Sequence, residues 1–209
     1  DSDEAIAAME YVKSLKWDYD VLTADPTNED WGTGFTELGT GAAAMYIAAN
    51  DAVNQPTQVN GLPEDKLAMC PIPEGPGGQY SLYGGTPYMF SKDATEDEIN
   101  AALDYLEIMG KAPVVTDASI AGLEADAKNR VDNGVPVIKP FPVWTDADYV
   151  AAQEKVVKEY NNVDEKMFES YFDATSSAGL HTEEPGSTQD MYAELTSVLQ
   201  AVITDKDAD

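Results

Sequence analysis

The sequence predicts a helix-rich α/β fold in which helices flank a small mixed sheet of short strands. Long segments with apolar residues at helical spacing predict the helices, and short apolar runs bounded by glycine, proline or asparagine predict the strands. The chain has 209 residues and is 43% hydrophobic, which is enough to bury a substantial core. We therefore expect residues 1–209 to form a single domain.

The helices are predicted by start and stop signals as well as by periodicity. The clearest start is a capping box from Thr95 to Glu98, whose helix ends at Gly110. A short helix should begin in the segment Asn28–Trp31 and stop at the glycines from Gly39 to Gly41. Further helices are expected at 3–16, 119–131, 145–160, 164–172 and 187–204. The last one carries an apolar stripe, Met191 to Ile203, which should bury against another element.

Four short runs predict the strands. Ala43–Ala48 lies between a glycine and an Asn-Asp pair, and Leu67–Ile72 runs into a Pro/Gly loop. Tyr80–Tyr83 and Thr86–Phe90 flank the pair Gly84–Gly85, where the backbone must bend or be approached closely. We expect these runs to supply the strands of the sheet.

The charge of the chain excludes two classes of partner. With 39 acidic and 12 basic residues, its formal net charge is −27, which repels nucleic acid and anionic membranes. No apolar stretch approaches the roughly 20 residues of a membrane span. We therefore predict no nucleic-acid partner and no direct insertion of this segment into a membrane.

The sequence gives little support for catalysis. It contains no G-x-S-x-G, phosphate-loop or dinucleotide motif, so we predict no enzyme, no cofactor and no metal. The single cysteine, Cys70, lies in an apolar run and should be buried, and His181 has no metal-ligand spacing. A carbohydrate-active hydrolase domain using paired carboxylates stays open as one alternative, because acidic residues are abundant. A surface interaction module is another.

Four segments together resemble family 1 extracellular solute-binding proteins, which serve ABC importers, mostly of carbohydrates. Phe35 to Met45 resembles the family's segment of phenylalanine, glycine, small residues and methionine, and Cys70 to Gly78 its Pro/Gly loop. Gly84 to Lys92 resembles its inner strand, and Tyr192 to Asp209 its penultimate helix. The resemblance covers nearly the whole chain.

The resemblance implies a fold, a function and a location. The family is about twice this length, so we expect the periplasmic-binding-protein-like second lobe, a C-terminal lobe whose N-terminal partner lobe is absent. It implies binding of a sugar or oligosaccharide by closure of two lobes, with ABC-transporter permease subunits as partners of the intact protein. The location it implies is extracellular, as a cell-surface lipoprotein or a periplasmic protein.

The first candidate binding residues are Asn50 and Asp51, because the resemblance directs the turn after Ala43–Ala48 toward the cleft. The alternative is that they cap the following segment. Tyr83, Gly84 and Gly85 form the second group: glycines let a ligand approach backbone amides, and a tyrosine ring can stack on a sugar. A plain β-bulge is the alternative there.

Two aromatic residues complete the candidate site. Trp31 is a possible stacking platform, with a core position as the alternative. Tyr192 lies near a family loop that can face the solute. Sugar sites combine such aromatic faces with a few polar groups that orient hydroxyls, and the candidate residues offer both.

Overall fold

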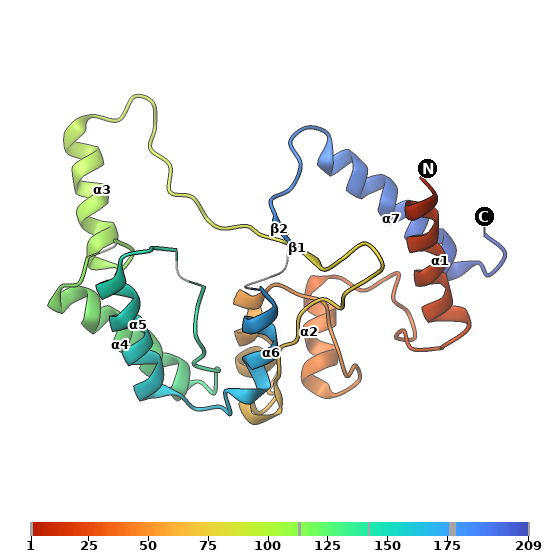
Figure 1. The fold of residues 1–209 in the computed structure, drawn as a ribbon, viewed down its shortest axis with the longest axis horizontal. Coiled ribbons are helices and arrows are strands. Elements are labelled where there is room, and N and C mark those ends of the chain that lie inside the picture. Colours follow the sequence, from red (N-terminus) through yellow and green to blue (C-terminus); the bar gives the residue numbers. More distant parts are fainter. Residues whose placement is uncertain (1, 113, 142, 176–178, 209) are drawn as a thin grey trace. The chain divides into compact units, whose positions relative to one another are not determined.

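The computed structural model describes residues 2–112, 114–141, 143–175 and 179–208 (Figure 1). They divide into two compact units, one holding Asp1–Ile47 with His181–Asp209 and the other Ala48–Leu180. The elements in chain order are α1 (Asp3–Trp17), α2 (Trp31–Thr40), η1 (Asn50–Val53), η2 (Gln55–Val59), η3 (Glu64–Lys66), β1 (Tyr80–Leu82), α3 (Glu96–Ile108), α4 (Asp117–Asp132), α5 (Ala147–Tyr160), α6 (Lys166–Thr175), β2 (Gly179–His181) and α7 (Thr188–Thr204). All seven predicted helices are confirmed, with ends displaced by a few residues.

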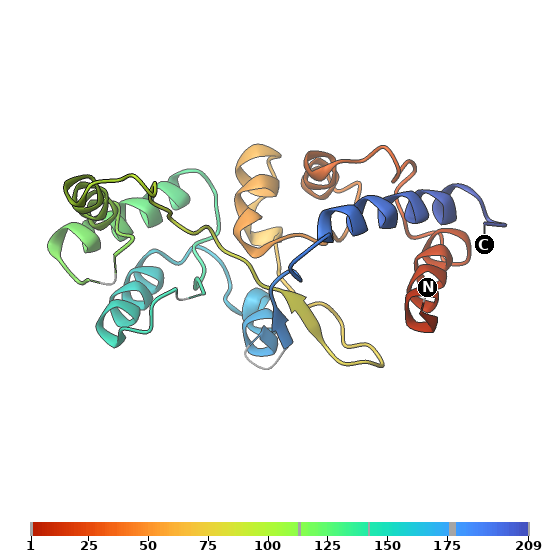
Figure 2. The same ribbon diagram turned by 90° about the horizontal axis from the view of Figure 1, so that it is seen from above.

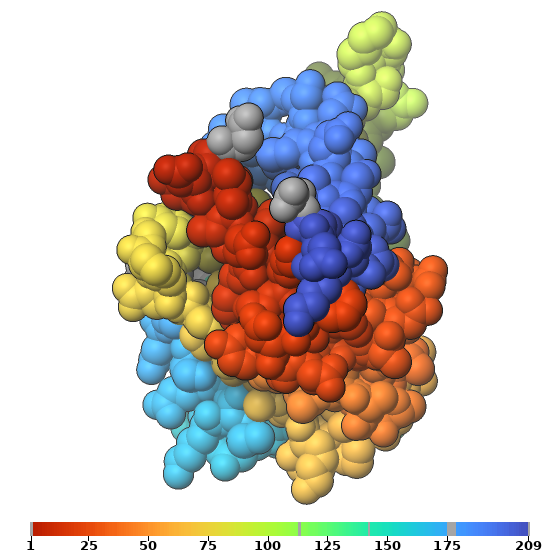
Figure 3. Space-filling view, turned by 90° about the vertical axis from the view of Figure 1, so that its right-hand side faces the viewer, coloured from red at the N-terminus to blue at the C-terminus, as the bar shows by residue number. Residues whose placement is uncertain are grey.

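In the first unit, α1 packs beside α7, although the two helices lie at opposite ends of the sequence (Figures 1 and 3). The Trp17 indole N–H donates to the Val202 carbonyl over 2.8 Å. The Lys13 ammonium donates to the Ala208 carbonyl over 2.6 Å. The first bond satisfies a carbonyl in the last turn of α7, where helix geometry leaves carbonyls without partners, and the second holds the tail that follows α7.

The apolar stripe of α7 is only partly buried. Val202 is buried where α7 meets α1, but Met191, Leu195 and Val198 are exposed. The prediction that the whole stripe buries is therefore wrong for its N-terminal half. The bonds from Trp17 and Lys13 show why, because they hold α1 against the C-terminal end of α7.

The second unit is built around α3, α4 and α5, of which α4 and α5 lie side by side (Figure 1). Ala127, Val137 and Val156 form its buried cluster. The Asn162 side chain closes the cluster at one end: its Nδ2 donates to the Val135 carbonyl over 3.1 Å, and its Oδ1 accepts from the Val137 N–H over 2.8 Å. The backbone of the segment 135–137 therefore bonds to a side chain and does not belong to a sheet.

The capping box that opens α3 is present as the sequence predicts. The Thr95 N–H donates to Glu98 Oε2 over 2.8 Å, and the Glu98 N–H donates to Thr95 Oγ1 over 3.3 Å. Both bonds satisfy N–H groups that the helix itself leaves unpaired. The chain then leaves α3 at Gly110, whose φ of 69° favours glycine.

The sheet is smaller than predicted. Among the described residues it consists of β1 and β2 alone, seen together in Figure 2, with a single further bridge between Gly75 and Gly78. The small sheet in a helix-rich fold is confirmed, but Ala43–Ala48, Leu67–Ile72 and Thr86–Phe90 are not strands. β2 (Gly179–His181) lies outside all four of the runs that were predicted to be strands.

The missing strands have a common physical reason, which is that no other described strand lies alongside these runs. Met45 and Met89 are 84% and 85% exposed, so the side chains that favoured strands have no facing layer. The Met69 N–H instead donates to the Met167 carbonyl at the start of α6, over 3.0 Å. Cys70, in the same run, is exposed, and its predicted burial is wrong because the run forms no covered strand.

Candidate functional site

Asn50 and Asp51 are exposed at the start of the 3₁₀ turn η1, directly after the extended run from Ala43. Ala52 and Val53, the next two residues, are buried and anchor the turn. Neither η1 nor the following η2 has a side-chain capping bond in the structure as described. The capping alternative is therefore not what holds these two side chains, and their polar groups face solvent.

Tyr83, Gly84 and Gly85 are exposed and follow β1 in an extended segment. A β-carbon at Gly84 or Gly85 would meet nothing within 4 Å, and neither residue has a positive φ. The β-bulge alternative fails as well, since both glycines lie beyond the end of β1. No contact among the described residues thus requires glycine at these positions, and the backbone amides are open to an approaching molecule.

Trp31 is the first residue of α2 and lies over two further aromatic rings. Its ring meets Phe35 edge-on at 4.8 Å, and Phe35 meets Tyr46 edge-on at 4.9 Å. The Tyr46 hydroxyl donates to the Trp31 carbonyl over 3.3 Å. Phe35 is buried, whereas Trp31 is 54% exposed, so the core alternative is wrong for Trp31.

The cluster depends on Gly34, which sequence reasoning missed. A β-carbon there would come within 2.3 Å of the Tyr46 ring, closer than any real contact allows. Tyr46 was also missed as a partner of Trp31. Burial raises the pKa of its phenol, with a further contribution from the Asp30 and Glu29 charges. The signal for both residues was a glycine inside a helical segment, which often marks a close approach.

Asp30 fixes the position of Trp31 by capping α2. Its Oδ1 accepts the Thr33 N–H over 2.8 Å and the Thr33 hydroxyl over 2.8 Å. These bonds lower the pKa of the Asp30 carboxyl, the backbone bond contributing most. An ionised carboxylate therefore directly precedes Trp31 in the chain, at the start of α2.

Tyr192 lies in the first turns of α7 and is tied to the preceding loop. Its hydroxyl donates to Glu183 Oε1 over 3.1 Å, and this bond raises the pKa of the phenol. The Thr188 hydroxyl donates to the Glu184 carbonyl in the same loop. The loop and the tyrosine are thus held together at one end of α7.

The candidate residues are divided between the two units. Trp31 and Tyr192 belong to the first unit, whereas Asn50, Asp51 and the segment Tyr83–Gly85 belong to the second. Within each unit, no hydrogen bond or ring contact between described residues joins two of them. Their assembly into a binding site was predicted and stays a prediction.

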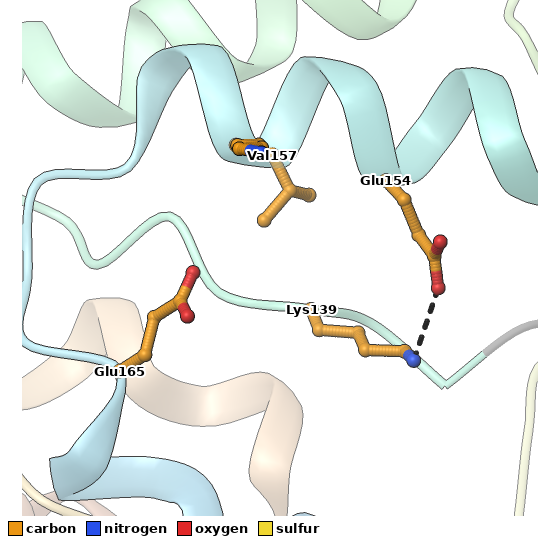
Figure 4. A pocket seen from close by; sticks show the side chains of 5 residues that line it. Lys139, Glu154, Val157 and Glu165 are labelled. Atoms are coloured by element: carbon orange, nitrogen blue, oxygen red, sulfur yellow. Dashed lines mark ion pairs between the residues drawn. The ribbon is translucent and has the colours of Figure 1, made fainter.

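Two adjoining hollows occur elsewhere, in the second unit. They measure about 310 and 520 Å³ and share Lys139, Val157 and Glu165. Figure 4 shows Val157 pointing from α5 into the space between Glu165 and the Lys139–Glu154 ion pair, whose N and O atoms lie 3.1 Å apart. None of the candidate solute-binding residues lines either hollow.

Two searches of the described residues found nothing. No group of three or more His, Cys, Asp or Glu side chains there is arranged to hold a metal ion. No described helix has the length and apolarity to cross a membrane.

Comparison with known families gave one match. The sequence profile of the family described as bacterial extracellular solute-binding protein matches residues 1–114. This stretch is more than half of the chain and runs from α1 to just beyond α3. It includes all the candidate residues except Tyr192. Comparisons with curated proteins and with solved structures returned no match.

Proposed function

This chain belongs to the bacterial extracellular solute-binding proteins, and from that membership we propose that it is the C-terminal lobe of a sugar-binding protein that serves an ABC importer. Residues 1–209 would form one of the two lobes that close around the sugar, and an N-terminal lobe would form the other. The family match carries the proposal, because it covers the segments that hold Trp31, Asn50 and Gly84. The function is binding of a solute for transport, without chemical conversion.

The choice of a sugar follows from the kinds of groups that face solvent. Trp31 offers an exposed indole that suits the apolar face of a pyranose. The preceding residue, Asp30, offers an ionised carboxylate that can accept a hydrogen bond from a hydroxyl. Asn50 and Asp51 add an amide and a carboxylate, both able to bond hydroxyls. Tyr83, with the open amides of Gly84 and Gly85, supplies a second ring and further donors. Tyr192, whose hydroxyl donates to Glu183, would contribute a further aromatic ring from α7.

Exposed apolar side chains support the two-lobe arrangement. Met45, Ile47 and Met89 are each more than 80% exposed, on extended segments that no strand covers among the residues described. Such surfaces commonly mark contact with another protein part. In the proposed cycle the solute contacts both lobes and favours the closed form, which the importer's permease subunits recognise. The protein would work outside the cell membrane, as a lipoprotein or in a periplasm.

The hydrolase alternative has no observation in its favour. A glycosidase needs a general acid whose pKa is raised. The carboxyls of Asp30 and Glu98 instead have a pKa below the usual value, because they accept hydrogen bonds at helix N-termini. The proposed function is therefore binding.

Calorimetric titration with mono- and oligosaccharides tests this proposal. The panel is titrated into the 209-residue chain and into the chain joined to its N-terminal lobe, and the sugars are then analysed for products. We expect saturable binding by the two-lobe protein, much weaker binding by the single lobe, and unchanged sugar. Trp31→Ala should weaken binding by about 1–3 kcal/mol, since an aromatic face is lost. Turnover of any sugar would overturn the proposal, as would equal binding by Trp31→Ala.

A further inference from the structure

The larger hollow has an apolar floor built from three parts of the second unit. Ile138 comes from the extended segment after α4, Val157 from α5, and Phe168 and Phe172 from α6. Phe168 is only 2% exposed, and Phe172 packs against Tyr171 and Phe141 at 5.4 and 5.5 Å. The volume of the hollow, about 520 Å³, lies in the range of small-molecule sites. The floor is therefore fixed by packing and suits an apolar body.

The rim carries charges of both signs in nearly equal number. Lys139, Lys158 and Lys166 line the two hollows, as do four carboxylates, those of Glu154, Glu165, Glu169 and Asp173. The whole chain has 12 basic and 39 acidic residues, so a quarter of its cations gather at this place. Among the described residues, Lys139 is paired with Glu154, while no ion pair includes Glu165 or Lys166.

This charge pattern restricts the ligand. An anion would have to approach a chain of net charge −27 and would leave the Glu165 carboxylate unmatched. A cation would leave the Lys166 ammonium unmatched. We propose that the hollow formed by Ile138, Val157, Phe168 and the charged rim binds a small zwitterion with an apolar body, the chemical class of an aromatic or branched amino acid. The ammonium would meet Glu165 and the carboxylate Lys166, with the side chain on the Phe168 floor.

A set of three probes with the same ring tests the charge requirement. L-Phenylalanine is the zwitterion, N-acetyl-L-phenylalanine the anion and L-phenylalaninamide the cation. Each is added to the isotope-labelled 209-residue chain at up to about 10 mM, and amide NMR shifts are followed. We expect shifts centred on Ile138, Val157 and Phe168, with both singly charged probes binding about fivefold more weakly, since one exposed ion pair is lost. Shifts elsewhere, equal affinities or no shift would overturn the proposal.

Two substitutions identify which charged side chain binds the ammonium and which binds the carboxylate of the ligand. Glu165→Gln should weaken phenylalanine about fivefold and leave the N-acetyl probe unchanged, whereas Lys166→Gln should weaken the N-acetyl probe as well. Glu74→Gln and Lys92→Gln are matched controls, because both residues are exposed and line neither hollow. A uniform effect of both rim variants on all probes would contradict the assignment. The result does not depend on the sugar site, so either proposal can fail alone.

Discussion

The second unit contains two regions of similar apolar character and opposite burial. In the packed helices α4 and α5, Val156 is 5% exposed, whereas Met89 in the extended run Thr86–Phe90 is 85% exposed. A helix satisfies its own backbone hydrogen bonds and needs only a packing face, while an extended run needs a neighbouring strand as well. Apolar content alone therefore does not determine burial. The region must also have a partner within the chain.

Truncation of one side chain from each kind of region should give the largest contrast. Phe168→Ala, in the covered part of α6, should lower the free energy of unfolding by about 3–5 kcal/mol, because it leaves a cavity. Met89→Ala should change it by less than about 0.5 kcal/mol. Urea denaturation followed by circular dichroism measures both. A similar loss in the two variants would mean that the run at 86–90 is covered in solution.

Two glycines extend the comparison to backbone positions. Gly34→Ala should cost about 1–3 kcal/mol, because the new methyl group displaces the Tyr46 ring from the cluster of Trp31. Gly84→Ala should leave stability nearly unchanged, since the methyl group meets open space. Thermal unfolding and near-ultraviolet circular dichroism of the aromatic rings provide the measurements. If Gly84→Ala proved the more destabilising, the open surroundings of Gly84 would be in doubt.

Among the substitutions expected to destabilise the fold, the smallest effect is at the start of α3. Thr95→Ala should cost about 1 kcal/mol, because the Glu98 N–H loses its capping acceptor. The bonds from Thr95 also lower the pKa of Glu98 from 4.5, the backbone bond contributing most. The box therefore stabilises the fold above the ordinary pKa of glutamate, and this stabilisation is lost as the pH falls through the lowered value.

Carboxyl NMR titration checks the capping box directly. In Thr95→Ala, the Glu98 pKa should move part of the way back toward 4.5, because the hydroxyl bond is gone while the backbone N–H bond remains possible. Thr40→Ala, at the exposed end of α2, is a control that should leave this pKa unchanged. An unmoved Glu98 pKa in Thr95→Ala would show that the hydroxyl contributes nothing.

The candidate site was predictable only in its parts. Exposed aromatic and glycine positions such as Trp31 and Gly84 were named from the sequence, and the structure leaves both accessible. Tyr46 and Gly34 were not predicted, because their contact joins α2 to a segment whose conformation the sequence misassigned. The hollow beside Phe168 was not predicted either, since it requires three separate segments to meet.

The sequence by itself determined the helices, the capping box of α3 and the acidic surface, because periodicity, capping residues and charge act over a few neighbouring positions. The box at Thr95 and the stop at Gly110 are examples. Only the tertiary structure decided which apolar runs became strands and which helix faces were covered. Tyr80–Leu82 found β2 as a partner, while Thr86–Phe90 found none among the described residues. The physical reason is that a strand is completed by another backbone, and its availability depends on distant parts of the chain.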